Sequence, residues 1–229
     1  LLGWVMVQSG LIEKPWVSPI NLSAHLLLAL FLYCYLLWVA LELLQPPVET
    51  GHIFSIKNFG ILLLALIFIQ IFYGGLMAGN KAALFYPTFP KTGSGYIPHG
   101  ILKLHPWPSN LIENIAMIQV IHRALGFVIA GCIFYFYRLC SLQPATPFFR
   151  KLLISLPVFV IIQVLLGILT LINSLGKIPV TYGVLHQMVA LLLLTSMTLI
   201  LFQLSGKPKT AKPGSTSYTP EKPLAGKPV

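Results

Sequence analysis

Five apolar segments, each long enough to cross a lipid bilayer, constrain the fold of this chain more than any other feature. The hydrocarbon core of a membrane needs about 20 apolar residues in helical form, and an open strand cannot satisfy its backbone hydrogen bonds there. Charged residues make up only 9% of the chain, whereas soluble domains contain about 25%. The sequence therefore predicts an all-α, polytopic membrane helix bundle with spans at residues 20–44, 59–79, 114–138, 152–173 and 181–204.

The two ends of the chain differ from these five spans. Residues 1–12, LLGWVMVQSGLI, are apolar and are predicted to form the last turns of another span. Because Leu1 begins inside that apolar stretch, we expect further sequence upstream. Residues 205–229 combine Pro, Gly, Ser, Thr and Lys with few apolar side chains, a composition typical of a disordered tail.

The net charge of +10 is distributed in a way that indicates membrane orientation and argues against nucleic-acid binding. Basic residues gather in the tail and around the loop 139–151, which Arg138, Arg150 and Lys151 flank. Short loops on the cytoplasmic side of a membrane carry an excess of Lys and Arg. The loop and the C-terminal tail are therefore predicted to face the cytoplasm or matrix, and the long loop 80–113 is predicted to be external.

Three histidines lie inside the predicted spans. With the tail inside, His25, His122 and His186 each fall within the first turns of a helix that enters from the outer side. At 1.5 Å per residue they lie roughly 7–12 Å below the start of their helices. Ionisable residues at such a depth are candidates for function. We therefore expect all three to occupy the same leaflet at a similar depth.

Small residues accompany these histidines. Each is followed four residues later, on the same helix face, by a small side chain, and Gly183 precedes His186 by one turn. This spacing leaves room for a flat ligand, although small residues are also common where membrane helices pack together. The motif GGLMAG at 74–79 allows the same two interpretations. The small residues at the fourth position are Ala29, Gly126 and Ala190.

Two neutral imidazoles on facing helices are a common means of holding a haem iron in a helix bundle. His122 and His186 are the predicted pair. Arg123 follows His122 directly, and its guanidinium would suit haem propionates near the outer surface. The alternatives are a proton-relay histidine and an arginine that extends to lipid headgroups. Neither a disulfide nor a zinc site is expected of the dispersed Cys34, Cys132 and Cys140.

An internal similarity indicates two related halves. Residues 2–29 and 166–190 both contain a Leu-Gly span end, a short loop with proline, a histidine and an alanine four residues later. Such similarity is typical of duplicated structural units. The predicted organisation is the end of an N-terminal half (1–44), a cytoplasmic linker (45–58), a C-terminal four-helix haem-binding half (59–204) and the tail (205–229).

The motifs resemble those of the haem A synthases, in the form that lacks a cysteine pair in the outer loop. The matching segments run in order through residues 3–195. They are GWVMVQSGL, SAHLLLA, GGLMAGNKAALFYPTFP, YIP, LIEN, IQVIHRALGF, GILTLI and LHQMVAL.

The resemblance implies a site and a reaction. His122 and His186 would be the axial ligands of a haem b, and His25 would be a ligand of the substrate haem O. The reaction of the family oxidises a methyl group of haem O to a formyl, which gives haem A for the terminal oxidase. The family's catalytic Glu belongs to an E-x-x-H-R motif, but Gln119 takes that place before His122. No catalytic residue is therefore assigned to this chain, and the catalytic Glu is expected upstream.

Other functions and partners follow as expectations. The alternative functions are a membrane b-type cytochrome in quinone-linked electron transfer and a multi-span transporter. Haem O synthase, oxidase assembly factors and membrane lipid are the expected partners, nucleic acid is not, and a homo-oligomer is left open. The expected location is a bacterial plasma membrane or a mitochondrial inner membrane.

Overall fold

The structure, a computed structural model, describes residues 3–4, 8, 17–44 and 54–206. Within these residues, five helices are long and apolar enough to cross a membrane. They match the five predicted spans one to one, which confirms the prediction of an all-helical, polytopic membrane protein. The helices are α2 (Pro19–Leu44), α3 (Phe54–Gly79), α4 (Ile115–Ser141), α5 (Pro147–Ile172) and α6 (Val180–Leu204).

Some predicted segments lie largely outside the described residues. These are the apolar residues 1–12, of which 3, 4 and 8 are described, the linker residues 45–53, and residues 207–229 of the tail.

Two helices begin earlier than the hydropathy pattern indicates. The predicted linker 45–58 is wrong at its C-terminal end, because α3 already begins at Phe54. The start of α5 was predicted at residue 152, but the helix begins at Pro147. The Thr146 side chain accepts a hydrogen bond from the Phe149 amide, and proline at the first helical position suits a helix start. Local capping chemistry, which hydropathy does not detect, therefore sets this boundary.

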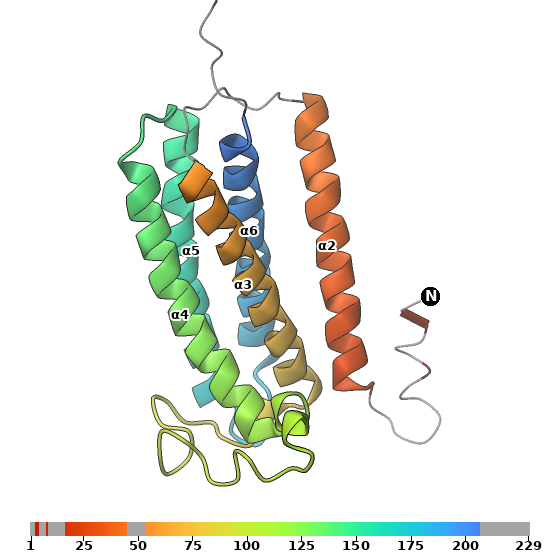
Figure 1. Ribbon diagram of the computed structural model, residues 1–229. Coiled ribbons are helices and arrows are strands. Elements are labelled where there is room, and N and C mark those ends of the chain that lie inside the picture. Colours follow the sequence, from red (N-terminus) through yellow and green to blue (C-terminus); the bar gives the residue numbers. More distant parts are fainter. Residues whose placement is uncertain (1–2, 5–7, 9–16, 45–53, 207–229) are drawn as a thin grey trace, which may run out of the picture.

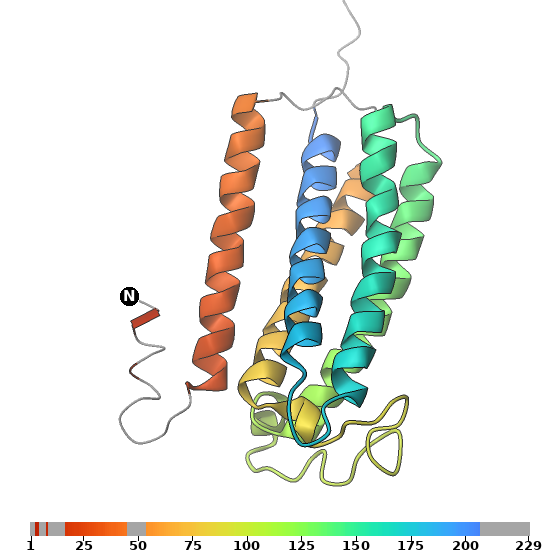
Figure 2. The ribbon, with the colours of Figure 1, turned by 180° about the vertical axis from the view of Figure 1, so that it is seen from behind.

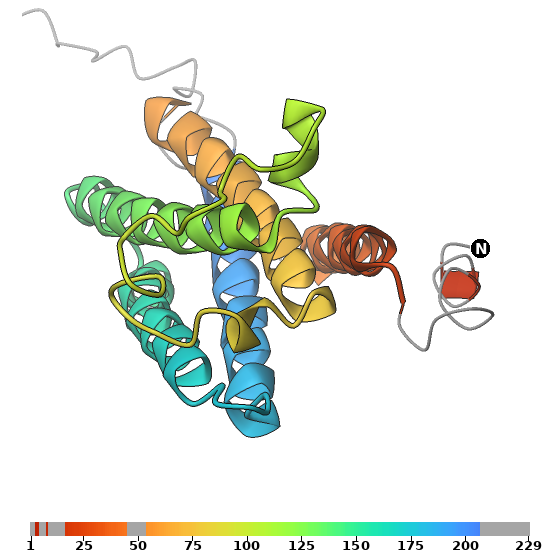
Figure 3. The same ribbon diagram turned by 90° about the horizontal axis from the view of Figure 1, so that it is seen from below.

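Four of the helices form a closed bundle in chain order. Helix α3 packs on α4, α4 on α5, α5 on α6, and α6 again on α3, while α2 lies outside this ring against α3 and α6 (Figures 1 and 2). Helices α4 and α6 therefore lie diagonally across the bundle (Figure 3). This diagonal matters because α4 carries His122 and α6 carries His186.

The apolar core fills one end of the bundle. Leu63, Phe136, Leu156 and Met197 are fully buried and belong to one cluster of core residues. They come from the first half of α3 and α5 and the second half of α4 and α6, so they gather at the same end. We call this the core end, and the opposite end, where loop 80–114 lies, the loop end (Figure 1).

The loop 80–114 covers the loop end and anchors α4. Its helix η1 (Ala82–Leu84) contacts α3, α4 and α5, and η2 (Trp107–Leu111) contacts α4. Asn114 caps α4 by accepting a hydrogen bond from the Ala116 amide at 3.0 Å. The same side chain donates to the loop carbonyl of Gly100 at 2.8 Å. One residue thus fixes both the start of α4 and the path of the loop above it.

Candidate functional site

The three histidines inside the spans lie at the same depth. His25 follows the first residue of α2 by six residues, His122 follows that of α4 by seven, and His186 follows that of α6 by six. At 1.5 Å per residue, each lies about 9–10 Å into its helix. All three helices begin at the loop end (Figure 1).

Residues at this depth of the bundle are partly exposed. The four ranges 69–74, 120–128, 161–170 and 181–192, which we call the histidine band, come from α3, α4, α5 and α6. The structure describes every residue in these ranges, and none of them is buried. Protein interiors are normally packed as densely as organic crystals, as the core end is. No whole residue of the histidine band is therefore fully enclosed, although single polar atoms of Gln70, His122 and Gln163 are buried there.

His186 is held by a single residue of α5. Its Nδ1 lies 3.0 Å from the backbone oxygen of Gln163, and its Nε2 lies 3.2 Å from the Gln163 side-chain nitrogen. A carbonyl oxygen only accepts, so Nδ1 carries the proton and donates it. Nε2 is then the unprotonated nitrogen and accepts from the amide. This is the tautomer that offers Nε2 to a metal.

His122 has a similar glutamine neighbour, this time from α3. The Gln70 side-chain nitrogen lies 3.4 Å from His122 Nε2 and donates to the His122 backbone oxygen at 3.0 Å. The second contact fixes the amide orientation, because its nitrogen must face that carbonyl. His122 Nδ1 is buried and has no hydrogen-bond partner. A buried polar atom without a partner is costly and points to an unfilled role.

The two imidazoles lie at the same level of the bundle. Although α4 and α6 are diagonal, an electrostatic interaction links the His122 and His186 side chains. The two helices approach from opposite sides of the histidine band, which is the arrangement that a group ligated from both faces requires. The structure thus brings together the two histidines that the sequence pattern pairs.

Both imidazoles pack against glycines of the preceding helix. A Cβ atom at Gly167 would lie 3.0 Å from His186 Cε1, and one at Gly74 would lie 3.5 Å from His122 Cε1. At Gly126 a Cβ would lie 3.2 Å from the Gln70 side-chain nitrogen, so this glycine gives room to the glutamine. Nothing lies within 4 Å of a Cβ at Gly183. Two imidazole nitrogens on opposite helices are the donor set that a haem iron takes, and of these glycines only Gly183 faces open space.

Arg123 holds the outer loop. Its guanidinium donates to the Lys91 oxygen at 3.1 Å, to Thr92 Oγ1 at 3.0 Å and to the Tyr86 oxygen at 3.1 Å. These acceptors replace water around a charge that would otherwise be costly inside a membrane. Only Nε, which is buried, has no hydrogen-bond partner. The predicted partner of this residue was a haem propionate, and the structure provides loop acceptors for the terminal nitrogens.

Gln119 lies one turn before His122 and is fully buried. Its side-chain nitrogen donates to the Tyr86 oxygen at 3.3 Å, and its Oε1 has no partner. An amide cannot exchange a proton as a carboxylic acid does. The residue therefore supports the loop and supplies no acid–base group next to His122.

His25 lies on α2, outside the four-helix ring. A Cβ at Gly3 would lie 3.3 Å from its Cε1, and its Nδ1 is buried without a partner. This repeats the relation between His186 and Gly167. Helix α2 packs on α3 where Gly75 faces Ser23, since a Cβ there would lie 2.5 Å from Ser23 Oγ. The contacts of Gly75 and Gly79 fit the helix-packing interpretation of the motif 74–79, and room for a ligand there stays a prediction.

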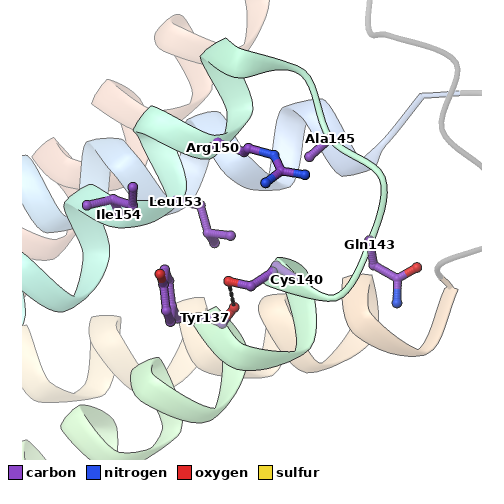
Figure 4. Close-up of a pocket in the computed structure, with 8 residues that line it drawn as sticks. Tyr137, Cys140, Gln143, Ala145, Arg150, Leu153 and Ile154 are labelled. Atoms are coloured by element: carbon purple, nitrogen blue, oxygen red, sulfur yellow. Dashed lines mark hydrogen bonds between the residues drawn. The ribbon is translucent and has the colours of Figure 1, made fainter.

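Other hollows in the structure lack the histidines. A cavity of about 140 Å³ lies between the end of α4 and the start of α5, where Tyr137, Cys140, Arg150 and Leu153 line it (Figure 4). An apolar groove of about 250 Å³ lies between α2, α3 and α6 and includes Cys34. The first is at the core end, away from the histidine band, and neither groups the ligands that a metal site needs.

Sequence reasoning missed Gln70 and Gln163. The available signal is a repeated Gln-x-x-x-Gly pattern, QIFYG at 70–74 and QVLLG at 163–167. Positions four apart share a helix face, so each motif presents an amide and a gap to the histidine of the next helix. The pattern gains meaning only after the helix pairs are known.

Comparisons with known proteins find relatives that share one name, Heme A synthase. The chain is 36% identical over 206 residues to the "Heme A synthase" of Flavobacterium johnsoniae, which covers 89% of this chain and 60% of that protein. It is 37% identical over 218 residues to the human "Heme A synthase COX15", covering 91% of this chain and 52% of that protein. For Nitrosospira multiformis the identity is 36% over 198 residues, covering 85% and 55%. The chain thus spans about half to three-fifths of the length of these relatives.

No solved structure matches the chain. A family model described as "Cytochrome oxidase assembly protein", COX15-CtaA, matches residues 1–198. This match and the relatives confirm the resemblance drawn from the motifs, and the chain belongs to the COX15-CtaA family of cytochrome oxidase assembly proteins.

Proposed function

We propose that this chain binds a b-type haem between His122 and His186 and acts as part of a haem A synthase. The observation that carries the haem site is the histidine band, where two imidazoles on diagonal helices lie at one depth, each beside a glutamine of the preceding helix. The names of the relatives, Heme A synthase from bacteria and human, support the reaction. That reaction oxidises a methyl group of haem O to a formyl and provides haem A for the terminal oxidase.

The chain's own residues would have distinct tasks in this site. His122 and His186 would hold the iron through Nε2, and the Gln163 backbone oxygen would keep the His186 ring in the required tautomer. The bound haem would accept and pass on single electrons. Arg123 and Gln119 would keep loop 86–92 over the site and limit the entry of water. His25 would ligate the substrate haem O.

In the part of the chain that the structure describes, neither His122 nor His186 has a carboxylate one turn before it, which supports electron transfer as the task of this half. Gln119 occupies the place one turn before His122, and it cannot serve as a general base. Among the described residues, the Glu42 carboxylate accepts a hydrogen bond from Trp38 Nε1 at 2.9 Å near the end of α2, far along the helix from His25. We infer that the acid–base chemistry of the reaction belongs to the other half of a complete synthase.

The domain organisation is part of the proposal. Residues 54–204 would form the C-terminal haem-binding half, residues 1–44 the end of the N-terminal half, residues 45–53 the connection, and 205–229 a cytoplasmic or matrix-facing tail. The closed ring of α3 to α6, with α2 outside it, supports this division. The chain is an integral membrane protein, and its host would be a bacterial plasma membrane or the mitochondrial inner membrane. Haem O synthase and oxidase assembly factors would be its neighbours.

The haem site is tested by optical spectroscopy. The purified chain is expected to show low-spin haem bands in a reduced-minus-oxidised spectrum, with one haem per chain. His122→Ala and His186→Ala should each abolish these bands, whereas His105→Ala, in the exposed loop, should keep them. Retention of the bands in either of the first two variants would rule out ligation by this pair.

The reaction needs a separate test, because a plain b-type cytochrome would give the same spectrum. The pair of histidines without an adjacent carboxylate is the observation that favours such a cytochrome. Cells that make haem O but lack their own haem A synthase should be supplied with this chain joined to the missing length of a relative. Haem A in extracted pigment supports the synthase, and haem O alone supports the cytochrome.

A further inference from the structure

Two glutamines contact the nitrogens that would bind iron. In both cases a side-chain amide of the preceding helix approaches His Nε2, at 3.2 Å for Gln163 and His186 and at 3.4 Å for Gln70 and His122. An amide N–H and a metal ion need the same lone pair of the imidazole. Both cannot use it at once.

We propose that Gln163 and Gln70 are positioning residues that occupy the ligating nitrogens before haem binds and leave when the iron arrives. The inference rests on the proposed haem site. In the unloaded protein each amide satisfies an imidazole nitrogen that would otherwise lie in the bundle without a partner, which is costly. The hydrogen bond must then break for coordination, so the glutamines lower the affinity for haem.

The Gln163 side chain can move away from His186 Nε2 without disturbing the position of the imidazole. Its backbone oxygen holds His186 Nδ1 at 3.0 Å, while only its side chain covers Nε2. The Gln163 Oε1 atom is buried and has no partner. Rotation of the side chain therefore breaks a single hydrogen bond, and the backbone contact keeps the imidazole in place.

Gln70 is held differently, which makes the two sites unequal. Its amide donates to the His122 backbone oxygen at 3.0 Å and lies farther from Nε2. The hydrogen bond to Nε2 is weaker at this distance, so less is lost when iron replaces it. Removing the Gln163 amide should therefore raise haem affinity more than removing the Gln70 amide.

The test is a titration of haem-free chain, made in cells deprived of haem synthesis, with ferric protoporphyrin IX. Gln163→Met keeps the length of the side chain but removes the N–H, and Gln163→Asn draws the amide back by one methylene. Both should bind ferric haem about two- to tenfold more tightly, as expected for one hydrogen bond no longer broken. Gln70→Met should show a smaller increase.

Iron-free protoporphyrin IX separates this role from a merely structural one. It has no metal to compete for Nε2, so its affinity should be the same in the unchanged chain and in Gln163→Met. The matched control is Gln187→Met, the same change at an exposed position of α6, which should alter neither titration.

Three results would overturn the inference. Unchanged or weaker ferric haem binding in both Gln163 variants contradicts it, as does a shift that is equal for both porphyrins. If the unchanged chain shows no histidine-dependent haem binding, the proposed haem site fails and the inference fails with it. If haem binds through the histidines and the Gln163 variants bind it as tightly as the unchanged chain does, only the inference fails and the proposed haem site stands.

Discussion

At the scale of single residues, Arg123 shows how a charged side chain is accommodated next to a ligating histidine. The sequence places it one residue after His122 in an apolar helix, where a charge costs at least about 2.5–3.5 kcal/mol. Its terminal nitrogens donate to three acceptors in loop 86–92. The charge is therefore used to hold a cover over the site, a purpose that needs a loop contact and cannot be read from the helix alone.

Gly167 gives a prediction at this scale. A Cβ there would lie 3.0 Å from His186 Cε1, so Gly167→Ala should push the imidazole out of line. Overpacking of this kind costs about 1–3 kcal/mol, which corresponds to roughly five- to 150-fold weaker haem binding in the same titration of the haem-free chain.

The control for this variant is Gly131→Ala in α4, where nothing lies within 4 Å of an added Cβ. Both changes raise helix propensity by about 1 kcal/mol, so a difference between them reports on the imidazole. Equal haem affinity in the two variants would show that Gly167 does not position His186.

The histidines and the glutamines show which part of the candidate site could be predicted from the sequence and which could not. Depth along three parallel helices was enough to predict that His122 and His186 share a level of the bundle. Gln70 and Gln163 were not found, because glutamine in a span has many roles and its partner depends on which helices are adjacent. Only the packing of α3 on α4 and of α5 on α6 gives them a partner.

At the scale of elements, the five helices were predicted from hydropathy and their ends were not. Long apolar runs have few alternatives in a membrane, so their number and order follow directly. The start of α5 depends on Thr146 as a cap, and the start of α4 on Asn114. Such caps act over three residues and are invisible to a window of about 20.

The contact of α4 with the outer loop gives the prediction for this scale. In Arg123→Ala the loop loses three hydrogen bonds from a charged group, each worth about 1.5–3 kcal/mol. Segments held by fewer contacts open more often, so trypsin should cut after the exposed Lys91 roughly tenfold faster or more.

Arg138→Ala, an exposed position near the end of α4, is the control and should leave cleavage at Lys91 unchanged. Peptide mass spectrometry over a time course measures the rate at that site. If Arg123→Ala and Arg138→Ala are cut at Lys91 at the same rate, the guanidinium does not hold the loop.

At the scale of the whole molecule, the two ends of the bundle have different tasks. The core end is packed by buried apolar residues from all four helices, and the histidine band has none among its described residues. The first supplies buried apolar packing, and the second carries the histidines that we propose to bind haem. The sequence indicates where the polar side chains of the spans lie, but which levels are filled by buried apolar residues depends on how the helices pack.

The orientation of the bundle in the membrane is predicted from the distribution of basic residues, which differs little between the two ends. Apart from Arg123, which lies within α4 and bonds the outer loop, four basic side chains of the described residues lie at the core end and four at the loop end, so the excess on one side comes from the lysines of the tail. They are Lys57, Arg138, Arg150 and Lys151 at the core end, and Lys81, Lys91, Lys103 and Lys177 at the loop end.

Labelling of single cysteines in intact cells measures this orientation. In a chain whose three native cysteines are replaced by alanine, Ser94→Cys in the outer loop should react with a membrane-impermeant maleimide. Leu142→Cys, in the loop after α4, should react only after permeabilisation, and the cysteine-free chain should not react at all. The reverse pattern would place the histidine band, which lies about 9–10 Å from the loop end, near the cytoplasm or matrix. Haem would then enter the site from that side, and loop 86–92 would cover it from within the cell or organelle.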